Sequence, residues 1–506
     1  MNRRNLLLSA VSWGGLGALS LWAAKASGAK MSGMMMSSSS VNMSGMQDAP
    51  DRIQQLPTGA PLSDLVKLSN TTTQPGQFNS VIEAAVTQHE FVPGLKTDVL
   101  AYNGALPGAM IEVFEGDHVK INFKNRIPEQ ASTIHWHGLE IPSDQDGNPT
   151  DPVASGADHT YEFTIPAGSA GTYWYHPHPH QVTAEQVYRG LAAPFIVRSK
   201  DDPLSADLGD TILVISSVSL DVDGKISENT MADQFNGREG DHVLVNGTKQ
   251  PVLTVAPGSS RRFRLYNATN GRFLRLAIGG HEITLVGTDG GLVSSPIKGL
   301  KELLLAPAER AEIVIDFHGE VGSFALKSLP YERGWMGMDK PAVETITIMD
   351  FALAGALVKP IALPEKLRDI NPLGEANARK RIEFNETMGM GNGMMMMGFQ
   401  IDGKAFDMDR IDLKSRKGDV ELWEIFNNSD MDHPLHIHGT QFQIVERERN
   451  GEVFPVAFMA WKDTVNITPK ETVRLKLRFN LPGMRMYHCH ILEHEDQGMM
   501  GKLQVV

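Results

Sequence analysis

Nitrogen and sulfur side chains that bind soft metal ions recur at short spacing in this chain. Histidines stand two positions apart in four places: His135/His137, His176/His178, His436/His438 and His488/His490. Since alternate residues of a β-strand project from the same face, each pair would place two imidazoles side by side. Eight buried imidazoles without a metal would leave many ring nitrogens without partners. The four pairs therefore predict a polynuclear metal site.

The only cysteine of the chain indicates a second, separate site. Cys489 lies between His488 and His490 and would face the opposite side of their strand, so its thiolate would serve another centre. His494 and Met499 follow it, and His433 precedes the pair at His436. Two histidines, one thiolate and a weak axial methionine describe a blue-copper electron-transfer centre. Zinc is the alternative metal, although structural zinc sites commonly recruit several cysteines.

The elements that must position these residues have a β pattern. VKINF at 119–123 and VRLKLRF at 473–479 alternate between apolar and polar residues, and glycine and proline punctuate such runs along the chain. Because no long stretch has convincing helical periodicity, we predict an all-β sandwich architecture.

An internal repeat relates the two ends of the chain. VKINFKN precedes TIHWHG as LWEIFNN precedes HPLHIHG, and YHPH at 175–178 is echoed by YHCH at 487–490. A third copy of the strand pattern, RFRLYNATN at 262–270, has no paired histidines after it. The repeat predicts three similar β-domains, of which the first and last carry ligands and the middle one is a spacer.

Length and charge exclude some classes of function. The chain has 506 residues, 41% of them hydrophobic, which suffices for several cores. Its 47 basic and 60 acidic residues give a net charge of −13, which argues against nucleic acid as a partner. One cysteine cannot form an internal disulfide, so the thiol is either inert in a core or used for chemistry.

The N-terminus has the pattern of an export signal. An Arg3-Arg4 pair precedes an uncharged apolar stretch from Leu6 to Ala24, and an A-x-A sequence follows. The twin arginine predicts a signal at 1–26 for the Tat export machinery, with an uncleaved membrane anchor as the alternative. The Met/Ser-rich stretch at 27–54 is predicted to be a disordered tether, although its thioethers could also catch soft metal ions.

Four motifs together resemble the copper signatures of the three-domain multicopper oxidases: HWHG, WYHPH, HPLHIHG and HCHILEHEDQGMM. Within that family the chain is most similar to bacterial periplasmic copper-efflux and copper-resistance oxidases, through the Tat-like signal, GKAFDM at 403–408 and WKDTV at 461–465. The resemblance implies three consecutive cupredoxin-like Greek-key β-sandwich domains, at 55–200, 201–354 and 355–506. It also implies a periplasmic monomer with four copper ions.

The resemblance further implies a role for each ligand. Type 1 copper would take His433, Cys489, His494 and Met499. Type 2 copper would take His135 and His436. The type 3 pair would take His137, His176 and His490 on one ion and His178, His438 and His488 on the other. His180, which extends the WYHPH motif, is expected near the site or at the surface rather than as a ligand.

Two carboxylates match acidic residues near the family's trinuclear cluster. Asp146 follows HWHG and Glu495 lies in HEDQG, so both are candidates for delivering the protons that the reduction of dioxygen to water requires. The alternative is that either is a plain loop carboxylate. Electrons would pass from type 1 copper through Cys489 to His488 or His490, the adjacent ligands of the cluster.

The electron donor is the open question of the sequence. MGMGNGMMMMGF at 388–399 is either a soft-ligand surface for cuprous ion or a flexible apolar loop. The resemblance implies a substrate-copper site near Met388, Met390, Asp430 and Met431, and hence a cuprous oxidase in copper tolerance. A general laccase that oxidises phenols or aromatic amines is the alternative. A more distant one is a non-enzymatic cell-envelope assembly protein of the same fold.

Overall fold

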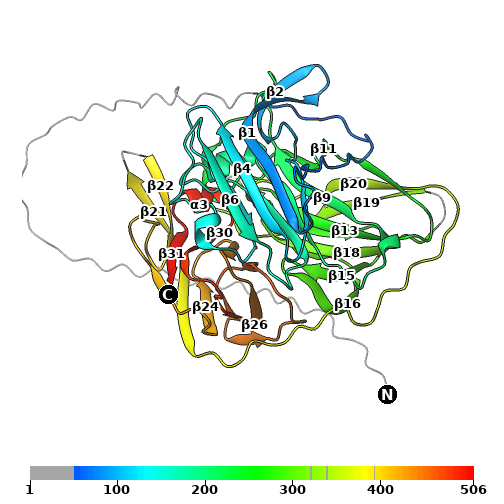
Figure 1. Cartoon of the computed structure of the whole chain (residues 1–506). Coiled ribbons are helices and arrows are strands. Elements are labelled where there is room, and N and C mark those ends of the chain that lie inside the picture. Colours follow the sequence, from blue (N-terminus) through cyan, green and yellow to red (C-terminus); the bar gives the residue numbers. More distant parts are fainter. Residues whose placement is uncertain (1–50, 320–321, 338–339, 392–393) are drawn as a thin grey trace, which may run out of the picture. The chain divides into compact units, whose positions relative to one another are not determined.

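The computed structural model describes residues 51–319, 322–337, 340–391 and 394–506 (Figure 1). The predicted signal at 1–26 and most of the predicted tether at 27–54 lie outside these residues. No helix in the described part is long and apolar enough to cross a lipid bilayer. The helices there are short: α1 (Thr183–Tyr188), α2 (Met231–Asn236), α3 (Leu492–Asp496), and the 3-10 turns η1 (Ser143–Gln145) and η2 (Ala206–Leu208).

Two facing four-stranded sheets form the first domain. One has the order β2 (Leu95–Tyr102), β1 (Gln77–Val92), β4 (His118–Arg126), β6 (Asp158–Thr164). The other has the order β3 (Ile111–Phe114), β8 (Ala193–Arg198), β7 (Gly171–His176), β5 (His135–His137). Their inner faces share one core, in which Ile82 and Phe123 of one sheet pack with Tyr173 and Phe195 of the other.

The middle domain has a larger sheet pair around its own core. The seven-stranded sheet runs β11 (Thr248–Lys249), β10 (His242–Val245), β9 (Thr211–Val218), β13 (Ser260–Asn267), β18 (Arg310–Asp316), β15 (Ile283–Thr288), β16 (Gly291–Leu300). The five-stranded sheet runs β12 (Val252–Val255), β20 (Ile346–Leu353), β19 (Gly322–Leu329), β14 (Leu274–Ile278), β17 (Leu303–Leu305). Leu265 and Ile313 of the first sheet pack with Leu276 and Phe351 of the second.

The third domain again pairs two sheets. The six-stranded sheet runs β22 (Met394–Ile401), β21 (Ala378–Gly391), β24 (Glu421–Asn427), β29 (Glu471–Leu477), β26 (Phe442–Arg449), β27 (Glu452–Phe454). The five-stranded sheet runs β23 (Leu413–Ser415), β31 (Met500–Val505), β30 (Gly483–Cys489), β25 (His433–Ile437), β28 (Thr464–Ile467). Trp423 and Leu475 pack against Leu435 and Leu503 across the sandwich.

The three copies of the repeated strand occupy equivalent places. β4, β13 and β24 each pair in parallel with an earlier strand of their domain, and each pairs antiparallel with a later one. In β4 the apolar Val119, Ile121 and Phe123 are buried while Lys120 is exposed, because alternate side chains face the core and the solvent. The predicted all-β architecture of three related domains is confirmed.

The expectation that each histidine pair lies within one strand is correct only for β5, which holds His135 and His137. His178, His438 and His490 each lie just beyond the end of a strand that holds the first member of the pair. The two rings of every pair are nevertheless neighbours, with centroids 5.0–6.2 Å apart. The chain turns at these strand ends without separating the rings.

The middle domain is more than the spacer that the sequence predicts. Its β13 carries Arg262 and Arg264, which are buried and form ion pairs with the buried Glu312 of β18. Thr172 of the first domain donates a hydrogen bond to the same carboxylate over 2.7 Å. Charged side chains are buried only where they are paired, so this network joins the two domains at a defined place.

Candidate metal centres

Eight imidazoles meet between the first and third domains, and each is at most 1% exposed. The Nε2 atom of His488 lies 3.1 Å from that of His438 and 3.2 Å from that of His178. The Nε2 atoms of His135 and His436 are 3.4 Å apart. The two ligand-bearing domains thus contribute to one histidine cluster, defined as His135, His137, His176, His178, His436, His438, His488 and His490.

Oxygen acceptors determine the tautomer of most of these rings. In five of them Nδ1 faces an oxygen: His135 the carbonyl of Asp146, His176 that of Pro177, His436 that of Asp463, His488 that of Cys489, and His438 the carboxylate of Asp146, over 2.8–3.2 Å. A carbonyl oxygen only accepts, so Nδ1 carries the proton and Nε2 is left with a lone pair.

The facing Nε2 atoms are suited to bind a cation. Since His135 and His436 are both protonated on Nδ1, their Nε2 lone pairs point at each other and cannot form a hydrogen bond. The same holds for His438 and His488. Among the described residues, His490 has no hydrogen-bond partner on either ring nitrogen, although both nitrogens are buried. Such lone pairs are the ligand set that imidazole-binding metals such as copper and zinc use.

Burial keeps six rings of this cluster neutral and ready to bind a metal. Desolvation is the largest cause that holds the pKa of six rings well below the usual value: His137, His176, His178, His436, His438 and His490. Neighbouring imidazoles lower these pKa values further. Metal ions bind the neutral ring, so protons compete weakly here.

The glycines of HWHG and HIHG leave room for charged groups beside the cluster. Gly138 has φ +89°, and a Cβ there would collide with the carboxylate of Asp463. Gly439 has φ +63°, and a Cβ there would collide with the guanidinium of Arg485. Each position therefore needs glycine for both its left-handed backbone and its close contact.

Cys489 faces away from the histidine cluster and belongs to a second group, which we call the cysteine cluster: His433, Cys489 and His494. Sγ lies 3.4 Å from Nδ1 of His433 and 3.9 Å from Nδ1 of His494, and the two Nδ1 atoms are 3.4 Å apart. Nε2 of His494 donates to the carbonyl of Phe235 in α2 over 3.0 Å. Its Nδ1 lone pair therefore points inward, toward the sulfur.

The surroundings of Cys489 favour a bound cation as well. Burial raises the pKa of the Cys489 thiol well above its ordinary value, so a metal ion is needed to keep the thiolate. The backbone N–H of Ile491 approaches the sulfur at 3.4 Å. Met499, the candidate axial ligand, is fully buried in the same core, and its backbone carbonyl accepts from the N–H of Cys489 over 3.0 Å.

Comparison with known proteins identifies the family to which the chain that carries these two clusters belongs. Three family profiles, each described as multicopper oxidase, match residues 83–202, 220–346 and 379–506. The chain belongs to the multicopper oxidase family. Its oxidase relatives couple the oxidation of reducing substrates, such as metal ions or phenols, to dioxygen, so this chain is an oxidoreductase that uses copper ions. The non-enzymatic alternative is not favoured.

Individual relatives cover nearly the whole chain. A solved multicopper oxidase from Campylobacter jejuni, described as a metallo-oxidase, is 42% identical, with a TM-score of 0.84 over 90% of this chain and 98% of that one. The multicopper oxidase mco of Staphylococcus haemolyticus is 34% identical over 85% of this chain and 89% of its own. A laccase of Bacillus subtilis is 27% identical over 88% and 97%.

The two candidate proton carriers of the oxidase both touch the histidine cluster. Asp146 is fully buried, and its Oδ2 lies 3.2 Å from Nδ1 of His438. Glu495, in α3, places Oε2 3.0 Å from Nδ1 of His488 and Oε1 3.5 Å from Nδ1 of His178. Burial would raise the pKa of Glu495, but the two rings outweigh it and lower the pKa.

Of the four predicted substrate residues of the oxidase, the structure describes the side chains of Asp430 and Met431, which differ in burial. Asp430 is an exposed side chain that lies 3.5 Å from Nζ of Lys470, whereas Met431 is fully buried. The side chains of Met388 and Met390 lie outside the described part of the structure. His180 is half-buried against Phe406 and is not among the clustered rings.

Sequence reasoning missed two residues that touch candidate ligands, Asp463 and Glu386, and a third, Arg310, that pairs with one of them. Asp463 lies in the WKDTV motif, and its Oδ1 is 3.1 Å from Nε2 of His137. Arg310 of the middle domain pairs with that carboxylate. Glu386 places Oε1 3.0 Å from Nε2 of His433. Only Asp463 had a sequence signal, because WKDTV belongs to the resemblance, whereas the other two contacts are long-range.

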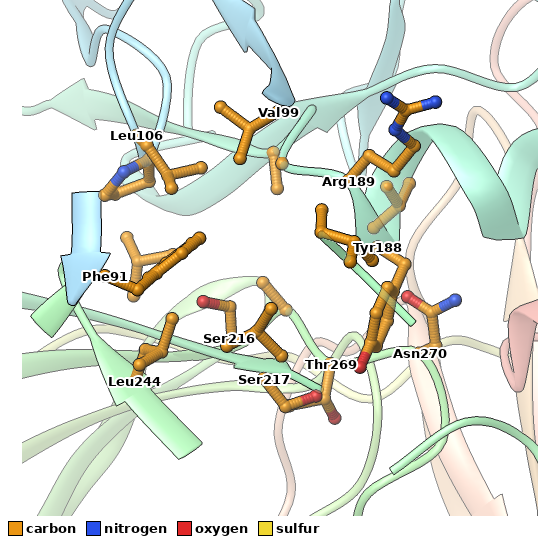
Figure 2. A pocket seen from close by; sticks show the side chains of 18 residues that line it. Phe91, Val99, Leu106, Tyr188, Arg189, Ser216, Ser217, Leu244, Thr269 and Asn270 are labelled. Atoms are coloured by element: carbon orange, nitrogen blue, oxygen red, sulfur yellow. The ribbon is translucent and has the colours of Figure 1, made fainter. Parts of the chain in front are cut away.

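Two pockets of the oxidase differ in their relation to the clusters. The cavity in Figure 2, about 30 Å³, is lined by apolar residues such as Val99, Leu106 and Leu244, and its lining includes no candidate ligand. A pocket of about 220 Å³ is lined by Gly138, Thr440 and Gln441, which directly follow the HWH and HIHG segments. The larger pocket is therefore the one beside the histidine cluster.

Proposed function

We propose that the oxidase holds four copper ions in these two clusters. Type 1 copper is held by His433, Cys489, His494 and Met499, type 2 by His135 and His436, and the type 3 pair by the other six histidines. The observation that carries this proposal is the set of Nε2 lone pairs that face one another. When bound, the copper ions supply one-electron transfer and the reduction of dioxygen to water.

The chain itself connects the two clusters. Cys489 is bonded through its backbone to His488 and His490, whose rings lie in the other cluster. This covalent path consists of the Cys489 side chain, the adjoining peptide unit and one histidine side chain, so it supports electron transfer between the centres without any rearrangement.

Asp146 and Glu495 have the placement that proton delivery needs. Both carboxylates are buried and lie within 3.2 Å of a ring nitrogen of the cluster. A buried carboxylate in such contact can accept a proton and pass it to the oxygen that is being reduced, as negative charge accumulates there. The pocket beside Gly138 and Gln441 supports access for dioxygen and water at the same interface.

We further propose that cuprous ion is the electron donor and that the hairpin β21–β22 delivers it. In Figure 1 this yellow hairpin stands beside α3, which carries His494. Glu386 and Phe399 are cross-strand partners in the hairpin. Glu386 contacts His433 over 3.0 Å, and Phe399 stacks on His494 with ring centroids 3.9 Å apart. One residue pair thus covers both imidazoles of the cysteine cluster.

This cover favours a small donor over a bulky one. His433 and His494 are both fully buried, so an aromatic donor would reach their ring edges only after the hairpin has moved. A cuprous ion is small and could be held by the soft thioethers of the sequence 388–397. It could then approach His433 through the carboxylate of Glu386, which contacts that ring and is itself 9% exposed.

Location and assembly belong to the same proposal. The Arg3-Arg4 signal supports export through the Tat machinery to the periplasm, where cuprous oxidation would serve copper homeostasis. Both ligand-bearing domains are in one chain, which supports a monomer. We propose domain limits at 55–200, 201–354 and 355–506, which the three sheet pairs support.

Steady-state oxygen consumption with cuprous ion and with an aromatic amine tests the donor. We expect Glu386→Gln to lower kcat/KM for cuprous ion by about tenfold, because the carboxylate that joins hairpin and ligand loses its charge. The aromatic amine should be affected less. Glu383→Gln is the matched control, since Glu383 lies on the same strand but contacts Asn385 and Asn428 instead.

Two outcomes would contradict the donor proposal. Equal losses for both donors would indicate damage to the cysteine cluster itself. Unchanged cuprous kinetics, with faster turnover of the aromatic amine, would make a general laccase the better description.

A further inference from the structure

A single arginine of the middle domain joins all three domains next to the histidine cluster. Arg310 opens β18 and is 1% exposed. Its Nε donates to the carbonyl of Thr172 in β7 of the first domain over 3.0 Å. One guanidinium nitrogen donates to Oδ1 of Asp463 in the third domain over 2.7 Å, and the other contacts Oδ2. Its backbone N–H donates to Asp289 of its own domain over 2.8 Å.

Asp463, whose carboxylate forms an ion pair with Arg310, orients two candidate ligands. It leaves the lone pair on a different ring nitrogen in each. Oδ1 lies 3.1 Å from Nε2 of His137, so this ring donates through Nε2 and keeps its lone pair on Nδ1, which is buried without a partner. The backbone carbonyl of Asp463 accepts from Nδ1 of His436 over 2.9 Å, which leaves the lone pair on Nε2. One residue therefore selects the ligand atom of two rings.

Asp463 could itself be taken for a metal ligand, because it lies in one group with His137 and His436. Its oxygens are already occupied, however. Oδ1 accepts from Arg310 and from Thr464 Oγ1, the latter over 2.9 Å, and Oδ2 contacts the second guanidinium nitrogen. The paired arginine both neutralises the buried charge and holds the carboxylate away from the metal.

We propose that Arg310 is a positioning residue of the oxidase, through which the middle domain sets the geometry of the histidine cluster. It fixes Asp463 so that Nδ1 of His137 and Nε2 of His436 both face the metal. It also fixes β7, the strand that ends in His176, through the carbonyl of Thr172. The proposal rests on the proposed metal-binding function of the cluster.

Lysine cannot replace arginine in this role. The contacts use three guanidinium nitrogens in one plane, two on a carboxylate and one on a carbonyl. An ammonium group is a single point charge and cannot hold the same carboxylate with two donors. The variant Arg310→Lys therefore keeps the charge and removes the geometry, while Arg310→Gln removes both.

The test measures copper affinity in the full-length, copper-loaded protein. The type 2 copper at His135 and His436 is followed by its electron paramagnetic resonance signal in competition with a chelator, and the Cys489 copper by its blue absorption. Loss of a partner of a metal ligand typically weakens metal affinity 10- to 100-fold. We expect about tenfold for Arg310→Lys and about 100-fold for Arg310→Gln at the histidine cluster, with an altered resonance signal and unchanged blue absorption.

Arg262→Lys is the matched control, because Arg262 is also buried in the middle domain but pairs with Glu312 and Asp202. It should leave the copper affinity of the cluster unchanged. Asp463→Asn should reproduce the loss, and the double variant Arg310→Gln/Asp463→Asn should be little worse than Arg310→Gln, since both act on one contact.

Three results would overturn the proposal: an unchanged affinity in folded Arg310→Lys, additive losses in the double variant, or an equal loss in Arg262→Lys. If Arg310→Gln does not fold, the copper affinities of Arg310→Lys and Asp463→Asn still test the proposal. A wild-type protein whose histidine cluster binds no copper would instead refute the proposed function.

Discussion

The histidine cluster and the cysteine cluster are built in different ways. The histidine cluster draws its rings from the first and third domains, and the oxygens that orient them include Asp146 and Asp463 from the same two domains. The cysteine cluster takes His433, Cys489 and His494 from the third domain alone, and one hairpin of that domain covers both rings.

The two clusters therefore depend on different features of the fold. The histidine cluster depends on how the three domains pack, because its acceptors and the arginine that holds one of them come from different domains. The cysteine cluster takes its three residues from one domain, and within the described residues only His494 is oriented from outside that domain, by the carbonyl of Phe235 in the middle domain. It also depends on which donors the hairpin admits. A change at the contact between Arg310 and Asp463 should therefore disturb the first cluster, and a change in the hairpin should disturb the second.

The largest expected effect comes from a substitution that should remove the metal centre of one cluster and leave the other intact. Cys489→Ser should abolish the blue absorption and the oxidation of every donor, because serine cannot supply a thiolate. The histidine cluster should keep its copper, since none of its rings belongs to the cysteine cluster. Absorption spectra and copper analysis check this. A variant that stayed blue would show that Cys489 is not the ligand.

A second prediction concerns proton delivery to the histidine cluster. Glu495→Gln should slow reoxidation of the reduced enzyme by dioxygen about 10²- to 10⁴-fold, the usual contribution of a positioned proton carrier. Copper content and blue absorption should persist. We expect the same direction for Asp146→Asn. Rapid-mixing kinetics measure the step.

The control for this prediction lies on the same helix. Glu493→Gln should reoxidise at the normal rate, because Glu493 accepts from the backbone of Arg238 and from Asn270 rather than from a cluster ring. A normal rate in Glu495→Gln, or a comparable slowing in Glu493→Gln, would count against the relay.

Two neighbouring residues of the predicted substrate site differ in burial, and their variants should differ in stability. Met431→Ala should lower the free energy of unfolding by about 2–5 kcal/mol, because Met431 is fully buried and its removal leaves a cavity. Asp430→Asn should change that free energy by less than about 0.5 kcal/mol, since Asp430 is exposed. Chemical denaturation measures both. A cuprous-specific kinetic defect in Asp430→Asn would restore it as a substrate ligand.

The smallest expected effect is a pH dependence of the copper-free protein. Burial lowers the pKa of His137, His436 and His438 below the usual 6.5. The unfolded chain then binds more protons below about pH 6.5, so the stability that these rings contribute is lost as pH falls. The melting temperature should fall from pH 7 to pH 5 without copper and change less with copper bound. Equal slopes would contradict this.

Much of the fold could be predicted because its signals are local. The alternation in 119–123 and 473–479 reports which side chains face a core, and the repeat places equivalent strands in three domains. The histidine pairs and Cys489 could be predicted from their spacing, because the two rings of a pair stay neighbours even where the strand ends between them.

The rest depended on contacts that spacing does not encode. Arg310 and Asp463 are separated by more than a hundred positions, and no local motif around either residue predicts their contact. Asp430 and Met431 are adjacent in sequence yet differ completely in burial, since one faces Lys470 and the other a core. The contact of Glu386 with His433 follows from how β21 lies on the third domain.

Diffraction from copper-loaded crystals, with anomalous maps at the copper absorption edge, tests the central claim most directly. We predict one copper peak among His433, Cys489 and His494, and three peaks within the histidine cluster, with Nδ1 of His137 and Nε2 of His436 as ligand atoms. Asp463 should remain paired with Arg310 and outside the coordination sphere. Copper bound by Asp463, or no peak beside Cys489, would contradict the account.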